Sequence, residues 1–202
     1  KFAGTFGDFG CFSLHPLKNL NVWGDGGYLI IKSKKNYERM RLLRNHGLIG
    51  RNTNLLFGYN SRLDTIQAVV ANHLLKKIKT ITSSRIKNSL YLEKKLKDFK
   101  ELNFKVRHKN LKEVFHLYEI RVNNPKIRNK LVNYLRLNSI DAKIHYPVPM
   151  HLQPAAKLYK LKKGMYPKAE EIAKTTISLP VHEFLKKKQL DHIVNVFERF
   201  FK

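Results

Sequence analysis

The chain has 202 residues, a hydrophobic fraction of 43% and a formal net charge of +25 at pH 7. This hydrophobic fraction is enough for a buried core, which excludes wholesale disorder. No apolar run approaches the roughly 18–20 residues that a membrane-spanning helix needs, so we expect no membrane partner. A single cysteine, Cys11, excludes an internal disulfide and a cysteine-rich zinc site, and its apolar neighbours predict a buried, inert thiol.

The positive charge has two interpretations. One is a surface for nucleic acid or anionic lipid. The other is a solvated covering of helix faces, because the lysines are spread along the chain in short clusters among apolar residues. Aromatic side chains are not interleaved with these clusters as they are in platforms that stack on bases. We therefore expect no specific nucleic-acid partner.

In chain order, the first predicted elements are two strands, a helix and a long helical region. Residues 10–14 and 28–31 are short apolar runs typical of strands, separated by a loop rich in glycine and asparagine. Residues 34–45 have a helical pattern that Gly47 suits as a cap. Residues 61–98 carry the longest helical signal, without glycine or proline; if this region bends, Thr82-Ser83-Ser84 is the expected place.

The second part of the chain mixes short strands with helices. We predict strands at 114–122 and 143–145, helices at 126–138, 167–174 and 185–201, and an extended segment at 177–180. The fold class is therefore α/β. Residues 1–60 are expected to be the end of an α/β domain, residues 61–99 long linking helices, and residues 100–202 a small α+β domain.

Lys18 is the candidate for covalent chemistry. It lies just past the end of the first predicted strand, and strand ends in α/β folds are where ligands bind. A partly desolvated lysine in such a place can form a Schiff base with a carbonyl group. Ser13, at the end of the strand, has a hydroxyl group that can reach a phosphate oxygen. Spacing alone, however, favours the ordinary alternative, a surface lysine.

Residues 7–20 resemble the cofactor-lysine motif of the DegT/DnrJ/EryC1/StrS family of sugar aminotransferases, with the serine, the His-Pro pair and the lysine in register. Further segments typical of this family follow in the right order: 23–27, 43–47, 58–68, 145–153 and 177–180. Each segment alone is weakly specific. Together and in order they are highly specific, and they span nearly the whole chain.

The resemblance implies the C-terminal half of a fold-type I aminotransferase that uses pyridoxal 5'-phosphate, a homodimer with shared active sites. Its substrates would be a nucleotide-diphosphate keto-sugar and glutamate, the amino donor. Lys18 would hold the cofactor as a Schiff base and then move a proton, while the cofactor acts as electron sink. Some relatives carry histidine at this position and perform dehydration, so the retained lysine favours amino transfer.

The resemblance also implies roles for five further residues. Ser13 would bind the cofactor phosphate, and Asn60 would reach the phosphate of the neighbouring subunit's cofactor. Arg62 would contact an anion of the substrate, or pair with Asp64 on the same turn. His145 and His151 would lie near the sugar, or else pack and stabilise the turns around them. No histidine and carboxylate cluster has metal-ligand spacing, so we expect no metal site.

Relatives supply three further features from their N-terminal half: a phosphate-cradling turn, a ring stacked on the pyridine, and an aspartate that pairs with the pyridinium nitrogen. None of these can be assigned here, and the chain begins without methionine. We therefore expect a fragment of a cytoplasmic enzyme that is inactive alone. The alternatives are a catalytically dead or regulatory homologue and a basic module that binds anions or nucleic acid.

Overall fold

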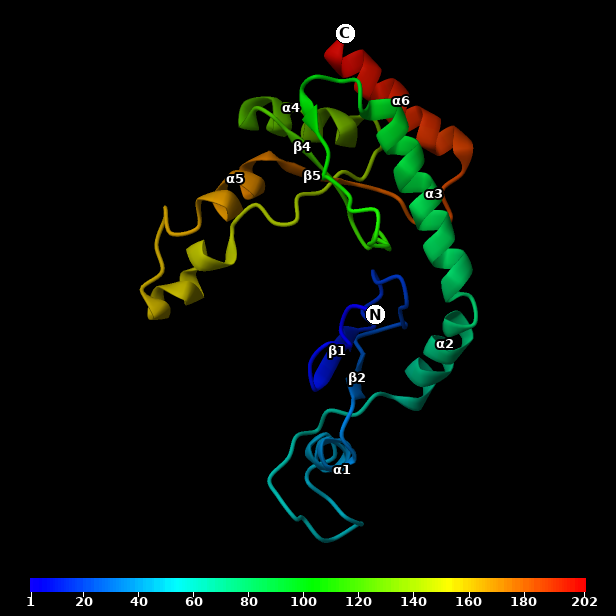
Figure 1. Ribbon diagram of the computed structural model, residues 1–202, viewed down its shortest axis with the longest axis vertical. Coiled ribbons are helices and arrows are strands. Elements are labelled where there is room, and N and C mark those ends of the chain that lie inside the picture. The colour runs from blue at the N-terminus through cyan, green and yellow to red at the C-terminus, as the bar shows by residue number, and fades with distance from the viewer. The chain divides into compact units, whose positions relative to one another are not determined.

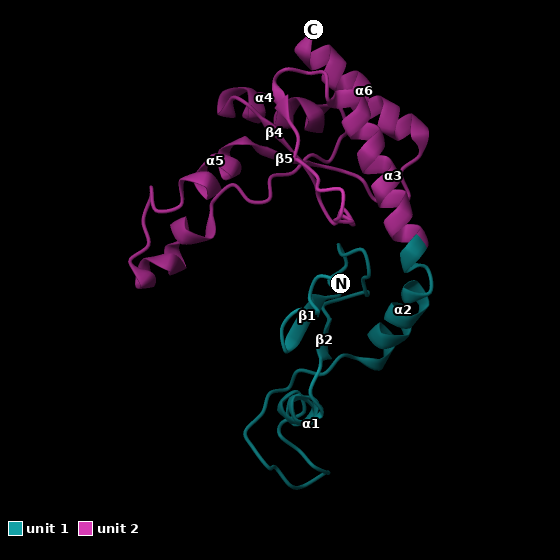
Figure 2. Cartoon of the chain, in the orientation of Figure 1, with its two compact units in different colours: residues 1–79 teal, residues 80–202 magenta.

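The computed structural model describes residues 1–202, which form two compact units, residues 1–79 and residues 80–202 (Figure 2). Both units contain helices and strands, so the predicted α/β class is confirmed. Neither unit has a helix with the length and apolar character that a membrane crossing requires.

The first unit is built on an antiparallel pair of strands, β1 (Phe9–Ser13) and β2 (Gly27–Ile31), drawn in blue in Figure 1. The register pairs the end of β1 with the start of β2. Helix α1 (Lys34–Leu43) follows, and its N-cap Ser33 accepts a hydrogen bond from the backbone N–H of Asn36. The predicted strands 10–14 and 28–31 and the predicted helix 34–45 are confirmed, with ends that differ by at most two residues.

Alternation along β1 decides which of its side chains are exposed. Gly10 is buried, whereas Cys11 and Ser13 lie on the opposite, open face. The prediction of a buried thiol is therefore wrong, because Cys11 is exposed. Its apolar neighbours in the sequence belong to the other face of the strand.

The long helical region is two helices rather than one. Helix α2 (Thr65–Leu75) ends where the N–H of Lys77 donates to the carbonyl of Leu74, and helix α3 (Ile78–Leu96) begins directly afterwards. Helix α3 runs unbroken through residues 82–84, so the expected place of the bend is wrong. The break lies beside the boundary of the two units, which falls after residue 79.

The second unit packs helices on a three-stranded antiparallel sheet in the order β3, β4, β5. Its elements are β3 (Leu102–Asn103), β4 (Tyr118–Val122), α4 (Pro125–Leu137), η1 (Met150–Leu152), η2 (Pro154–Tyr159), α5 (Pro167–Thr175), β5 (Thr176–Leu179) and α6 (Lys187–Phe201). Helix α4 contacts β4, β5, α5 and α6. The predicted helices at 126–138, 167–174 and 185–201 are confirmed, whereas the sequence analysis missed β3 and the two 3₁₀ helices.

Two predicted strands are shorter in the structure. The strand expected at 114–122 begins only at Tyr118, because Phe115 has a φ of 48° that interrupts the extended backbone. The strand expected at 143–145 is reduced to a single antiparallel bridge between Lys143 and Ser178. This bridge still places the backbone before His145 along β5.

The core of the second unit lies between the sheet and its helices. Strand β4 contributes Tyr118, Ile120 and Val122, each at most 1% exposed. Helix α6 contributes one apolar face, and its buried members are Leu190, Ile193, Val194, Val196 and Phe197. Helix α4 adds three buried apolar side chains from the opposite direction: Leu131, Val132 and Leu135.

We expect Leu135→Ala to lower the free energy of unfolding by about 2–5 kcal/mol. The side chain of Leu135 is 0% exposed, so its truncation leaves a cavity in the core. The matched control on the same helix is Leu137→Ala, where the side chain is 85% exposed and the expected change is within about 0.5 kcal/mol. Chemical denaturation of both variants measures the difference. Equal destabilisation by the two substitutions would contradict this description of the core.

Candidate functional site

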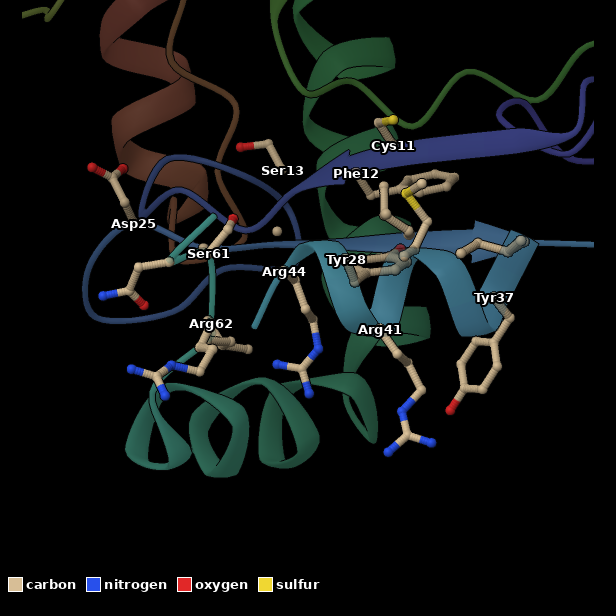
Figure 3. A pocket seen from close by; sticks show the side chains of 17 residues that line it. Cys11, Phe12, Ser13, Asp25, Tyr28, Tyr37, Arg41, Arg44, Ser61 and Arg62 are labelled. Atoms are coloured by element: carbon tan, nitrogen blue, oxygen red, sulfur yellow. The ribbon is translucent and has the colours of Figure 1, made fainter. Parts of the chain in front are cut away.

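A pocket of about 1000 Å³ in the first unit brings together three of the residues predicted to form the site (Figure 3). Ser13 enters it from the end of β1, and Asn60 and Arg62 enter it from the segment before α2. Asp25, which follows the cofactor-lysine segment, also lines it. Two lining residues that the sequence analysis did not select are Arg41 and Arg44, both at the C-terminal end of α1.

Lys18 lies in a tight turn after β1 and is not among the residues that line this pocket. Its backbone N–H donates to the carbonyl of His15 at 2.8 Å, and its carbonyl accepts from the side-chain amide of Asn21 at 2.9 Å. The ring of His15 accepts from the N–H of Leu17 at 3.2 Å, which connects this ring to the backbone of the loop. The turn therefore fixes the backbone of Lys18, and this residue is half-buried.

The loop around Lys18 is tied at both ends to its surroundings. The N–H of Leu14 donates to the carbonyl of Gly26 at 2.8 Å, and the N–H of Val22 donates to the carbonyl of Leu14 at 2.9 Å. The N–H of Trp23 donates to the side chain of Gln67 on α2 at 2.7 Å. These bonds join three of the sequence segments that resemble the aminotransferase family: 7–20, 23–27 and 58–68.

A second set of backbone bonds joins the end of α1 to the segment that carries Asn60. The N–H of Tyr59 donates to the carbonyl of Leu43 at 2.6 Å, and the N–H of His46 donates back to Tyr59 at 2.9 Å. The N–H of Ser61 donates to the carbonyl of Arg44 at 2.9 Å. We call this arrangement, formed by residues 43–46 and 59–61, the loop closure. It places Arg44 beside the segment that ends in Arg62.

Two glycines make the loop closure sterically feasible. Gly47 has a φ of +73°, and a Cβ atom there would lie 1.8 Å from the carbonyl oxygen of Leu56. A Cβ atom on Gly58 would lie 2.5 Å from the backbone nitrogen of Gly47. The overlap would be with backbone atoms, so rotation of a neighbouring side chain could not relieve it. The resemblance marked both glycines as family motif residues without giving this reason for them.

Arg62 is held by a neutral partner. Its guanidinium donates to the side-chain oxygen of Asn45 at 3.3 Å, and the alternative pairing with Asp64 is absent. The charge of Arg62 is therefore not neutralised by a carboxylate. This leaves the guanidinium chemically suited to an anion.

His145 and His151 line a different pocket, of about 990 Å³, in the second unit. Most of its other lining residues are apolar or aromatic, including Tyr146, Tyr159 and Tyr166. His145 Nδ1 lies 2.8 Å from the hydroxyl oxygen of Ser178 on β5. Its ring is thus oriented by the strand that the bridge at Lys143 brings alongside.

His151 is buried and paired with a residue that the sequence analysis missed. Its Nε2 donates to Oε1 of Glu170 on α5 at 3.0 Å, and the ring packs edge-on against Tyr166. The same carboxylate oxygen accepts from the N–H of Gly164 at 2.6 Å. The hydrogen bond from His151, followed by that from Gly164, lowers the pKa of Glu170. These contacts support the packing alternative for His151, since Glu170 already occupies its Nε2.

No pattern in the sequence pairs His151 with Glu170. Glu170 stands in the first turn of α5, where an acidic residue is usual for the helix dipole and gives no sign of a partner. Arg41 and Arg44 did have a signal, because Arg44 belongs to a segment typical of the family and Arg41 lies one turn before it on the same helix.

Residues 1–198 match the family described as "DegT/DnrJ/EryC1/StrS aminotransferase family". The chain belongs to this family. Among curated relatives, a "Pleiotropic regulatory protein" of Geobacillus stearothermophilus is 33% identical over 100% of this chain and 54% of its own length. A "UDP-N-acetyl-3-dehydro-alpha-D-glucosamine 3-aminotranferase" of Acidithiobacillus ferrooxidans is 32% identical over 98% of this chain and 52% of its own length.

Solved structures of the aminotransferase family agree with this assignment. The X-ray crystal structure of S. venezuelae DesV in complex with a ketimine intermediate superposes with a TM-score of 0.91 at 30% identity. The match covers 97% of this chain and 52% of the DesV chain. The chain thus spans about half the length of the relatives it matches, and the predicted family and fold are confirmed for that half.

We expect Gly58→Ala to destabilise the first unit by about 1–3 kcal/mol or more, because the added Cβ overlaps backbone atoms of the loop closure. The matched control is Gly50→Ala, where a Cβ atom would meet nothing within 4 Å. Hydrogen exchange at the amides of His46 and Ser61 reports the loop closure directly. Unchanged protection of these amides in Gly58→Ala would contradict the steric argument.

We expect the free energy of unfolding to fall as the pH drops below the ordinary glutamate pKa of about 4.3. In that range Glu170 becomes protonated in the unfolded chain, whereas in the folded chain its lowered pKa keeps the carboxylate ionised. Glu170→Gln should reduce this slope, measured by urea denaturation between about pH 3 and pH 6. The control Glu119→Gln removes an exposed carboxylate and should keep the slope. The same slope in wild type and Glu170→Gln would contradict the pairing.

Proposed function

We propose that this chain is the lysine-bearing half of an aminotransferase that uses pyridoxal phosphate and transfers an amino group to a nucleotide-linked keto-deoxysugar. The amino donor is glutamate, and the complete protein is a homodimer. The observation that carries the proposal is the family match over residues 1–198, which includes the segment with Ser13 and Lys18. The aminotransferase named in Acidithiobacillus ferrooxidans supports the class of substrate.

The donor groups of the first unit suit a phosphorylated cofactor. The hydroxyl group of Ser13 lines the pocket and can donate to a phosphate oxygen, and the guanidinium of Arg62 in the same pocket suits an anion of the substrate. Ser13 lies at the C-terminal end of β1, where ligands bind in α/β folds. In the homodimer, Asn60 serves the phosphate of the neighbouring subunit.

Lys18 supplies the reactive amine. The turn fixes the backbone of Lys18. Its amine would hold the cofactor through the aldehyde group and would carry a proton when it is free. When bound, pyridoxal phosphate supplies the electron sink for the bond changes at the amine-bearing carbon. His145 contributes at the sugar through a ring oriented by Ser178.

The isolated chain is inactive in this proposal. It spans about half the length of its relatives, and β1 and β2 form a sheet of only two strands. Leu29 and Ile30 on β2 are 47% and 40% exposed, which is unusual for the strands of a parallel or mixed α/β sheet. Residues outside this chain therefore complete both the sheet and the cofactor site.

A regulatory homologue is the second candidate. One relative, 33% identical over the whole of this chain, is named a pleiotropic regulatory protein. As a regulatory homologue, this chain would keep the fold and the cofactor site without turning over an amino donor. Turnover of glutamate with a nucleotide-linked keto-sugar by the complemented subunit would exclude this candidate.

We expect borohydride reduction with pyridoxal phosphate to label Lys18 selectively when the chain is combined with the complementary half of a relative. The reason is that a Schiff base forms only where the site holds the aldehyde beside an amine. Mass spectrometry of peptides locates the label. Lys18→Arg should abolish it, whereas Lys32→Arg, at an exposed lysine after β2, should leave it in place. Label scattered over surface lysines, without enrichment at Lys18, would contradict the proposal.

A further inference from the structure

One segment of the second unit buries very little of its own surface. We call this segment, residues 153–163 with η2 inside it, the strap. Its residues are half-buried or exposed, and none of them is buried. The apolar side chains of Leu158 and Tyr159 are 86% and 77% exposed. Burial of apolar surface therefore does little to hold the strap in place.

The hydrogen bonds within the strap are local. The N–H of Ala156 donates to the carbonyl of Gln153 at 2.9 Å, and the N–H of Lys160 donates to that of Lys157 at 3.0 Å. The side chain of Gln153 reaches the carbonyl of Val148 at 3.3 Å. Helix η2 mainly contacts its neighbour η1, and Figure 1 shows this part of the chain, in yellow, at the edge of the unit, far from α6. Because so short a 3₁₀ helix is not stable by itself in water, contacts outside the strap must hold it.

One carboxylate oxygen fastens both ends of the strap. Oε1 of Glu170 accepts from Nε2 of His151, which precedes the strap, at 3.0 Å, and from the N–H of Gly164, which follows it, at 2.6 Å. Glu170 is 8% exposed and belongs to α5, which packs against α4 and β4. Hydrogen bonds to a charged group are stronger than neutral ones. Glu170 is therefore the main polar connection between the strap and the body of the unit.

The backbone of the strap is suited to movement once this connection is released. Gly164 has a φ of 91°, and a Cβ atom there would meet nothing within 4 Å, so this residue can act as a hinge. Lys160 has a φ of 55°, a conformation that is unfavourable for a residue with a side chain. The strap contains four lysines, at 157, 160, 162 and 163, and no acidic residue. Repulsion between these charges favours a more extended segment.

The strap forms one wall of the apolar pocket that His145 also lines. It contributes Gln153, Ala155, Ala156, Tyr159 and Leu161, and helix α5 contributes Ala169, Ile172 and Ala173. We propose that the strap opens and closes this pocket and that Glu170 holds it closed. An open strap gives a ligand access to the pocket from the side that the strap otherwise covers. This device does not depend on the proposed amino transfer.

Hydrogen exchange of the wild-type chain in low concentrations of urea tests whether the strap opens by itself. The amides of Ala156 and Lys160 should exchange through a local opening that urea hardly changes, because this opening exposes little surface. The amide of Leu135, in the core helix α4, should exchange only through an opening that urea promotes. Equal opening free energies and equal urea dependence at all three amides would overturn the proposal. So would exchange of Ala156 and Lys160 at the rate of an unfolded peptide, because the strap would then not be closed.

Glu170→Ala tests whether this carboxylate holds the strap. Exchange at Ala156 and Lys160 should rise by about tenfold or more, the effect of losing a charge-assisted hydrogen bond, and by more than at Leu135. Neither strap amide donates to Glu170, so faster exchange reports movement of the strap and not loss of the amide's own partner. The matched control is Glu171→Ala, at the next position of α5, where an exposed carboxylate pairs with Lys168 and the expected change is less than about twofold.

Cleavage by trypsin gives a second measurement, because the enzyme cuts after the four lysines of the strap. We expect Glu170→Ala to be cut there about tenfold faster than the wild-type chain, since the rate follows the open population. Glu171→Ala should be cut at the wild-type rate, and Glu170→Gln, which keeps an acceptor oxygen, should lie between the two. Equal rates for Glu170→Ala and Glu171→Ala would overturn the role of Glu170. Faster cuts spread over the whole second unit would also overturn it, because Glu170 would then stabilise the unit and not the strap.

Discussion

The backbone contact between Gly47 and Gly58 is the constraint on which the site of the first unit depends. A Cβ atom on either residue would overlap backbone atoms at 1.8 Å or 2.5 Å. Because neither residue has one, residues 59–61 can hydrogen-bond to the end of α1. Asn60 and Arg62 then line a pocket with Ser13 and Arg44, residues that are far apart in sequence. A steric feature of two residues without side chains thus determines where charged side chains gather.

The second unit positions its polar residues by a different device, a buried carboxylate. Oε1 of Glu170 accepts from both His151 and the N–H of Gly164, and so joins α5 to the segments on either side of η2. The cost of burying this carboxylate is offset by the two hydrogen bonds, which also lower its pKa. The pairing fixes the position of His151, which lines the mostly apolar pocket of this unit. His145, held near Ser178, is the more accessible of the two histidines for a ligand in that pocket.

The chain belongs to the aminotransferase family and spans about half the length of its relatives. The lysine-bearing loop, the loop closure and the arginines are complete within this chain. Strand β2 is partly exposed, with Leu29 at 47% and Ile30 at 40%.

The sequence by itself determined the family, the fold class, most helices and strands, and the candidates Ser13, Lys18, Asn60 and Arg62. These follow from local patterns and ordered motifs, which tertiary packing does not alter. Only the tertiary structure decided the break between α2 and α3, the exposure of Cys11, the pairing of His151 with Glu170, and the gathering of Arg41 and Arg44 beside Arg62. Each of these depends on which surfaces meet after folding, and contacts between residues distant in sequence leave no periodic signal in the sequence.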